Sequence, residues 1–186
     1  MASMIQSDSP ATVVLGLGNL ILGDDGVGVH AVQRLQTDSR VPAEVQLLDG
    51  GTLGLTLLNH IAGARRLLVI DAVDAGVPPG TLIRLEGPEL SGMPGSGSVH
   101  QLGVADLLAS LGLMGQEPEE LVVLGIQPAS TELGTSLSAA AARTLDQVIE
   151  AAIAQLSQWL QPAGEDVRGN ALSAGRPRED ACTNSA

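Results

Sequence analysis

The chain has 186 residues, 44% of them hydrophobic, and a formal net charge of −12 at pH 7. This length and hydrophobic content predict one folded domain with a well-buried core of Leu, Val, Ile and Ala. The acidic balance and the 1% aromatic content argue against nucleic acid or an anionic membrane as partner, because phosphates repel the chain and bases find no stacking platform.

Apolar runs and helical patterns alternate along the first part of the chain. Residues 1–10 are polar and are expected to be flexible. Strands are predicted at Thr12–Leu17, at Val45–Leu48 ending at Asp49, and at Leu67–Ile70 ending at Asp71. The helices between them are predicted from apolar residues at helical spacing, first Val29, Val32 and Leu35, then Leu53, Leu57, Leu58 and Ile61 behind a Thr52 cap. This alternation predicts a parallel, right-handed arrangement.

The alternation changes after the third strand. Ala75–Gly80 is too short for a crossover helix, so the strand predicted at Thr81–Glu86 should run antiparallel at an edge of the sheet. Gly87–Val99 is rich in Gly, Pro and Ser, and a loop of this length in a compact domain is more often functional than idle. A helix at Leu102–Leu111, a strand at Leu121–Ile126 and a long helix beginning at Gly134–Ser136 are predicted to complete the fold.

The predicted fold class is an α/β three-layer sandwich with about five mostly parallel strands, one antiparallel edge strand and helices on both faces. The single domain is expected to span 11–162, and residues 163–186, which lack periodicity, are expected to be disordered. The one cysteine, Cys182, allows no intrachain disulfide, no apolar run is long enough to span a bilayer, and the first residues do not resemble a signal peptide. A cytoplasmic location is therefore expected.

Two adjacent carboxylates stand in the turn after the first strand. The sequence there is Gly16-Leu17-Gly18-Asn19-Leu20-Ile21-Leu22-Gly23-Asp24-Asp25-Gly26-Val27-Gly28. A turn between a strand and a helix often holds a phosphate at the helix N-terminus. Asp24 and Asp25 would repel a phosphate and attract a cation, so this turn predicts a different ligand.

Further candidate ligands follow the next strands. Ligands of open α/β sheets bind beyond the carboxyl ends of the strands, so Asp24 or Asp25, Asp49 and Asp71 are expected at one edge, with His100 arriving from the long loop. Two carboxylates and one imidazole suit a divalent ion such as zinc or nickel. Purely structural roles stay open for Asp24, as a helix N-cap, and for Asp49, as a turn acceptor. A structural role explains Asp71 less well, because desolvating a carboxylate is costly.

Four motifs occur in order along the chain: Gly18-Asn19-Leu20-Ile21-Leu22-Gly23-Asp24-Asp25-Gly26-Val27-Gly28, Asp49-Gly50-Gly51-Thr52, Ile70-Asp71-Ala72 and His100-Gln101-Leu102-Gly103. Together they closely resemble the hydrogenase maturation endopeptidases, which process the large subunit of NiFe hydrogenases. The resemblance covers residues 12 to about 160. It implies an endopeptidase that removes a C-terminal extension from the large-subunit precursor, its partner, once nickel has been inserted.

The resemblance also implies roles for individual residues. The metal-contacting positions of the family fall on Asp25, Asp71 and His100, and Asp25 stands where the family often has Glu. These three residues and Asp49 are the implied catalytic residues, and the motif of Asp49, Gly50, Gly51 and Thr52 is implied in substrate recognition and cleavage. The nickel is carried by the precursor, and zinc or cadmium is expected to occupy the same ligands in vitro.

Two other functions compete with this interpretation. Asp49 stands where a ribose-binding acid of a nucleotide-binding module would lie, but the third glycine of GxGxxG is missing after Gly16 and Gly18. A metal-dependent chaperone that binds the precursor without cutting it fits the same acidic surface and the same long loop. Only a protease changes the mass of the precursor.

Overall fold

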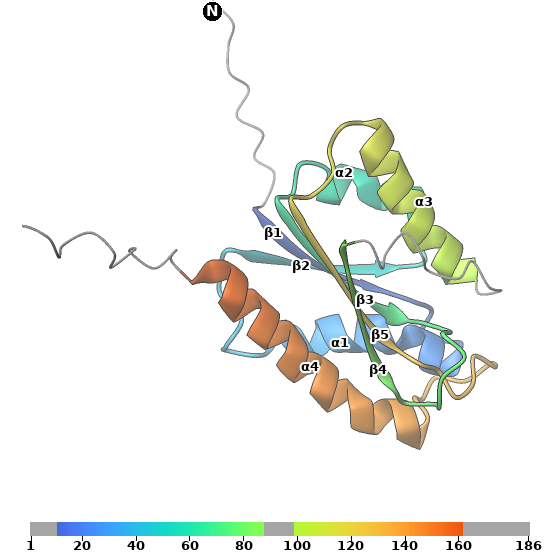
Figure 1. Cartoon of the computed structure of the whole chain (residues 1–186). Helices are drawn as coiled ribbons and strands as arrows, with labels where there is room; N and C mark the ends of the chain where they lie inside the picture. Colours follow the sequence, from blue (N-terminus) through green and yellow to red (C-terminus); the bar gives the residue numbers. More distant parts are fainter. Residues whose placement is uncertain (1–10, 88–98, 162–186) are drawn as a thin grey trace, which may run out of the picture.

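The computed structural model describes residues 11–87 and 99–161, with side chains in 11–87 and 104–161, and Figure 1 shows one sheet with helices on both faces. The strands are β1 (Thr12–Leu17), β2 (Val45–Gly51), β3 (Arg66–Ala72), β4 (Leu82–Glu86) and β5 (Glu120–Ile126). The helices are α1 (Val27–Leu35), α2 (Leu58–Ile61), α3 (Val99–Leu113) and α4 (Ala139–Leu160), with 3-10 turns η1 (Gly23–Gly26) and η2 (Gly54–Leu57). The predicted three-layer architecture is confirmed.

The strand order is β2-β1-β3-β5-β4. Strands β2, β1, β3 and β5 are parallel, and β4 pairs with β5 in the antiparallel sense at one edge, as the short Ala75–Gly80 connection predicts. Gly16 of β1 lies opposite Asp49 of β2 and Ile70 of β3, and Asp71 lies opposite Gly125 of β5. The ends of the four parallel strands therefore meet at one side of the sheet, here called the carboxyl edge.

The core is divided by the sheet into two apolar layers. One layer lies between the sheet and the helices α1 and α4. It contains strand residues such as Val14 and Leu68, and Trp159 near the end of α4. Val13, Leu15 and Val69 face the other way, toward η2, α2 and α3. Apart from Trp159, both layers consist of aliphatic side chains, as the composition predicts.

Two predicted helices differ from those observed. The helix expected behind Thr52 is a 3-10 turn followed by the short α2, and its first apolar residue, Leu53, is 59% exposed. Thr52 caps neither element. The last helix begins at Ala139, after an N-cap at Ser138 whose side chain accepts from the Ala141 amide, rather than at Gly134–Ser136. Helical spacing of apolar residues does not distinguish a single turn from a longer helix.

Several predictions fall on other parts of the chain. The expected flexible N-terminus, the expected disordered tail and most of the Gly/Pro/Ser-rich loop lie at 1–10, 162–186 and 88–98, outside the described residues. The proposed domain limits of 11 and 162 stay a prediction. Among the helices that the structure describes, none combines the length and the apolar character needed to cross a bilayer.

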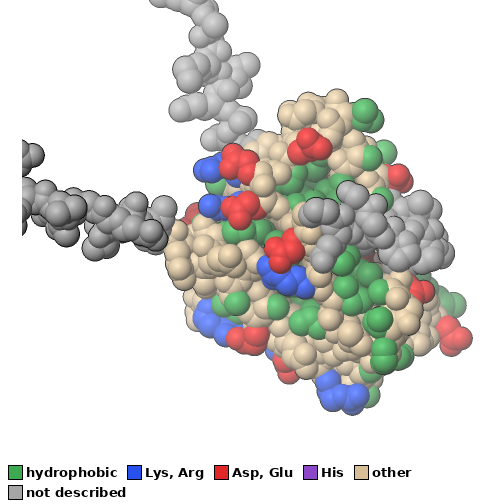
Figure 2. Space-filling view, in the orientation of Figure 1, with side chains coloured by type: hydrophobic (Ala, Val, Ile, Leu, Met, Phe, Trp, Pro, Cys, Tyr) green, Lys and Arg blue, Asp and Glu red, His purple; other side chains and the backbone are tan. Residues whose placement is uncertain are grey.

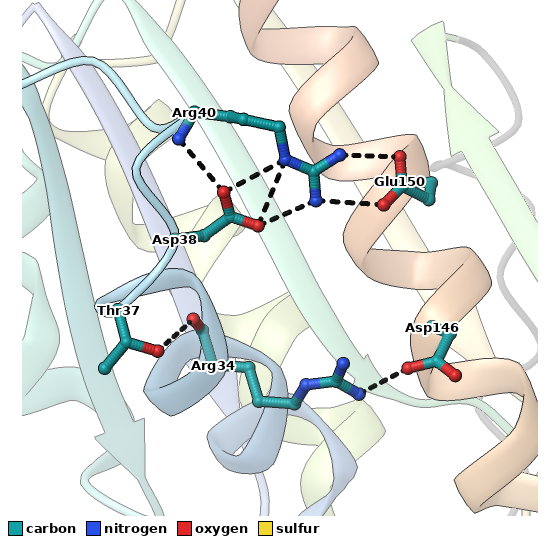
Figure 3. A network of polar contacts seen from close by, with 6 residues as sticks. All are labelled: Arg34, Thr37, Asp38, Arg40, Asp146 and Glu150. Atoms are coloured by element: carbon teal, nitrogen blue, oxygen red, sulfur yellow. Dashed lines mark hydrogen bonds and ion pairs between the residues drawn. The ribbon is translucent and has the colours of Figure 1, made fainter.

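Several charged side chains on the surface form ion pairs, and Figure 2 shows acidic and basic groups side by side on the face in view. A polar cavity of about 560 Å³ lies where α1 and the loop after it meet α4. Arg40 lies there between Asp38 and Glu150, at 2.7 and 2.9 Å from their carboxylate oxygens (Figure 3). Hydrogen bonds from Arg40 lower the pKa of Asp38 to about 2. These ion pairs connect α1 and the loop after it to α4.

Candidate functional site

Asp25 is held inside the turn that follows β1. Gly18 begins this turn with φ +122°, and a Cβ there would lie 1.8 Å from the carbonyl oxygen of Asp25, so no other residue fits. The chain then folds back, and the amide of Asn19 donates to Oδ2 of Asp25 at 2.8 Å. The Asp25 side chain is consequently buried, with 4% of the residue exposed.

Asp71 is the second buried carboxylate of the carboxyl edge. Asp71 is the last residue but one of β3 and is 1% exposed. Its Oδ1 accepts a hydrogen bond from the Ala72 amide at 2.8 Å. Burial raises the pKa of Asp71 to about 8; the Ala72 amide opposes this change and the charge of Asp25 adds to it. The charge of Asp25 acts on Asp71, so the two carboxylates lie in the same region of the carboxyl edge, and burial is the main cause that favours the protonated form of Asp71.

Two buried acids close to each other are costly for the folded state unless a proton or a cation neutralises them. A divalent cation would replace the proton of Asp71 and interact favourably with Asp25. Within the side chains that the structure describes, no group of three or more His, Cys, Asp or Glu residues could hold a metal ion. His100 lies in the first turn of α3, but its side chain is outside the described set. Asp25 and Asp71 thus lie at the same edge of the sheet, and the metal-binding role of all three residues stays a prediction.

Asp24 has a role that the sequence did not predict. Its side chain caps neither η1 nor α1, so the N-cap interpretation is wrong. Instead Oδ2 accepts from the Ala129 amide at 2.8 Å and Oδ1 accepts from the Ser138 amide at 2.6 Å. Asp24 therefore joins the turn of Asp25 to the segment between β5 and α4. No local pattern reveals this contact, because its partners lie 105 and 114 residues away.

Replacing Asp24 by alanine is expected to lower the free energy of unfolding by about 2 kcal/mol, because two partly buried amides lose a charged acceptor. The matched control is Asp146→Ala, which removes an exposed ion pair with Arg34 (2.6 Å; Figure 3) and should have little effect. Urea unfolding of both variants measures the difference. Equal losses in the two variants would contradict the structural role of Asp24.

The Asp49-Gly50-Gly51-Thr52 segment ends β2 beside the turn of Asp25. The Gly18 amide donates to the carbonyl of Gly51 at 3.0 Å, which joins the two turns. Asp49 is exposed, and its Oδ1 accepts from the Gly51 amide at 3.1 Å, so the turn-stabilising contact considered for it is present. Thr52 is also exposed. The segment is therefore accessible at the carboxyl edge, and its part in substrate recognition stays a prediction.

The remaining histidines lie apart from the pair of acids. His30 is half-buried within α1, and His60 is exposed on α2. Neither belongs to a metal-binding group among the described side chains. These positions are consistent with ordinary structural roles for both histidines.

Comparison with known proteins gives a single family. The family model described as hydrogenase maturation protease matches residues 29–155. The hydrogenase expression/formation protein HupD of Rhodobacter capsulatus is 41% identical over 150 residues, covering 79% of this chain and 71% of the relative. The hydrogenase 2 maturation protease of Escherichia coli is 36% identical over 154 residues, covering 82% and 92%.

A solved structure agrees with these relatives. The hydrogenase maturating endopeptidase HybD from Escherichia coli superposes with a TM-score of 0.76 at 33% identity, covering 80% of this chain and 93% of HybD. The shared fold, the matched family model and the relatives all indicate a peptidase rather than a nucleotide-binding module. This chain belongs to the hydrogenase maturation protease family.

Proposed function

We propose that this protein removes a C-terminal extension from the large-subunit precursor of a NiFe hydrogenase and recognises the nickel that the precursor carries. The observation that carries the proposal is the pair of buried carboxylates, Asp25 and Asp71, at the carboxyl edge of a maturation-protease fold. The names of the relatives, which include a hydrogenase 2 maturation protease, support the same class of substrate.

In this proposal, Asp25, Asp71 and His100 form an incomplete ligand set that the nickel of the docked precursor completes. Asp71 releases its proton when the cation arrives, since the pKa raised by burial keeps it neutral beforehand. These residues would hold the ion, which would anchor the substrate and, in a catalytic role, would also polarise the scissile carbonyl for attack by an activated water. The segment of Asp49, Gly50, Gly51 and Thr52, in which Asp49 and Thr52 are exposed, holds the substrate beside it.

The test compares nickel-loaded with nickel-free precursor. Wild-type protein is expected to cleave only the loaded form, whereas Asp25→Asn and His100→Ala should not cleave it. The matched control is His60→Ala, because His60 is exposed on α2 and should be dispensable. Mass spectrometry of the precursor gives the result. Equal cleavage of both precursors would overturn nickel recognition, and wild-type rates in Asp25→Asn and His100→Ala would overturn the ligand assignment.

The same measurement separates a protease from a chaperone that binds the precursor without cutting it, since only hydrolysis lowers the precursor mass. Zinc or cadmium is proposed to bind the same three ligands in vitro, because both accept mixed oxygen and nitrogen donors. We place the reaction in the cytoplasm, since a chain with Cys182 as its one cysteine forms no internal disulfide of the kind that oxidising compartments favour.

A further inference from the structure

Exposed apolar side chains gather beside the candidate site. Five of the eight exposed large hydrophobics among the described residues lie in the segments that follow β1, β2 and β5. They are Leu20 (37% exposed), Ile21 (55%), Leu53 (59%), Leu55 (54%) and Leu133 (84%). These five residues are called the apolar strip. Single exposed leucines are normal on protein surfaces, but a group of this kind indicates an interaction site.

Backbone hydrogen bonds join the three segments that carry the apolar strip. The Gly18 amide donates to Gly51 at 3.0 Å, which places the segment of Leu53 beside that of Leu20. On the other side, the Gly134 amide donates to the Ile21 carbonyl at 3.0 Å and the Gly23 amide donates to Gly134 at 2.8 Å. The segments therefore lie side by side in the order 51–55, 18–22 and 133–134.

The apolar strip is nearly uncharged in an acidic protein. Residues 16–23 and 50–58 contain no charged side chain, and Glu132 is the charged neighbour of Leu133 in the third segment, although the chain carries a net charge of −12. Contact with this surface therefore depends on burial of apolar area rather than on attraction between charges. The expected partner presents an uncharged, apolar surface of its own.

We propose that the apolar strip docks the folded large-subunit precursor, through an apolar patch beside the nickel site of the precursor. This inference rests on the proposed function. The strip is continuous with the candidate site, because Leu20 and Ile21 lie in the same turn as Asp25, and the Asn19 amide donates to the Asp25 carboxylate at 2.8 Å. A protein whose nickel reaches Asp25 and Asp71 must therefore lie over the strip. Docking by the strip determines KM, whereas the acids act on the bound nickel.

The test introduces a charge at single positions of the apolar strip: Ile21→Asp, Leu53→Asp and Leu133→Asp. Each is expected to raise KM for nickel-loaded precursor about tenfold while kcat changes less than about twofold, because an aspartate buried in an apolar contact loses its hydration. The matched control is Leu113→Asp, at the far end of α3 just before β5, where the side chain is 92% exposed. Its KM should equal that of the wild type.

A measurement of direct binding to the precursor tests docking by the apolar strip separately from the proposed protease function. If wild-type protein cleaves the precursor and the strip variants behave like Leu113→Asp, the docking proposal is overturned while the protease stands. If wild-type protein does not cleave, the proposed function fails, and a tenfold weaker binding of precursor by the strip variants still supports docking. If light scattering shows a wild-type dimer that Ile21→Asp dissociates without changing precursor binding, the strip is a self-association surface and the proposal is wrong.

Discussion

Asp71→Asn is expected to unfold at a higher urea concentration than the wild type at about pH 9, and to lose all processing of the precursor. The gain in stability follows from the burial of a carboxyl group that carries no neutralising partner in the described structure apart from its own proton. Asparagine has nearly the same shape and never ionises. The same exchange removes a proposed nickel ligand, so stability and activity should change in opposite directions.

The sign of the pH dependence of stability follows from the pKa values of Asp71 in the unfolded chain and in the folded protein. Burial and the charge of Asp25 raise the pKa of Asp71 from 3.8 to about 8, so the folded protein holds a proton that the unfolded chain has released. Below pH 3.8 both states are protonated and Asp71 imposes no cost. The stability of the wild type falls as the pH rises from there, and above about pH 8 the full cost, on the order of 5 kcal/mol, is present.

The measurement is urea unfolding of the wild type and Asp71→Asn at about pH 5 and about pH 9. The difference in free energy of unfolding should increase with pH. Asp106→Asn is the matched control, because Asp106 is exposed on α3 and its exchange should leave the pH dependence of the wild type intact. A constant difference between Asp71→Asn and wild type at both pH values would show that Asp71 is ionised in the folded protein.

Gly28→Ala is expected to lower the free energy of unfolding by at least about 3 kcal/mol. Gly28 is the second residue of α1, and a Cβ there would lie 2.1 Å from the Ile70 oxygen, 2.4 Å from the Leu17 oxygen and 2.7 Å from the Leu17 nitrogen. These are backbone atoms of β1 and β3, so no side chain can move to make room. The start of α1 must shift away from the sheet.

Gly134→Ala is the matched control for Gly28→Ala. A Cβ at Gly134 meets only the Glu132 oxygen, at 3.9 Å, which is an ordinary contact. Thermal unfolding should therefore show a large loss for Gly28→Ala and little change for Gly134→Ala. Because Ile70 directly precedes Asp71, the shift at Gly28 should also separate the two acids and reduce processing in the fraction that remains folded. A melting temperature of Gly28→Ala equal to that of the control would contradict the close approach of α1 to the sheet.

The strands could be predicted because each is a short apolar run, although β2 continues to Gly51, past its predicted end at Asp49. The limits of β1 were predicted as observed, and the antiparallel direction of β4 followed from the length of Ala75–Gly80 alone. The start of α4 could not be predicted in this way. Ser138 is fixed as its N-cap in a segment bound by the carboxylate of Asp24, and such a distant contact leaves no periodic signal.

The edge of the sheet at which the candidate site lies could be predicted from the same pattern that predicts the strands. Asp25 and Asp71 come after or at the end of predicted strands, so the parallel topology brings both to the carboxyl edge, and their role as metal ligands stays a prediction. The raised pKa of Asp71 depends on burial, which the sequence does not quantify. The roles of Asp24 and of the apolar strip depend on which loops touch, and loop contacts are set by the folded chain as a whole.

The single tryptophan gives this protein a built-in optical reporter. Trp159 is buried at the end of α4, whose 22 residues, at 1.5 Å per residue, place it roughly 30 Å along the helix from Ser138 and the carboxyl edge. The chain contains no tyrosine or phenylalanine, so ultraviolet emission arises from this one indole. Its fluorescence is therefore expected to follow the detachment of α4 during unfolding and to stay constant while a cation binds at the opposite end of the molecule.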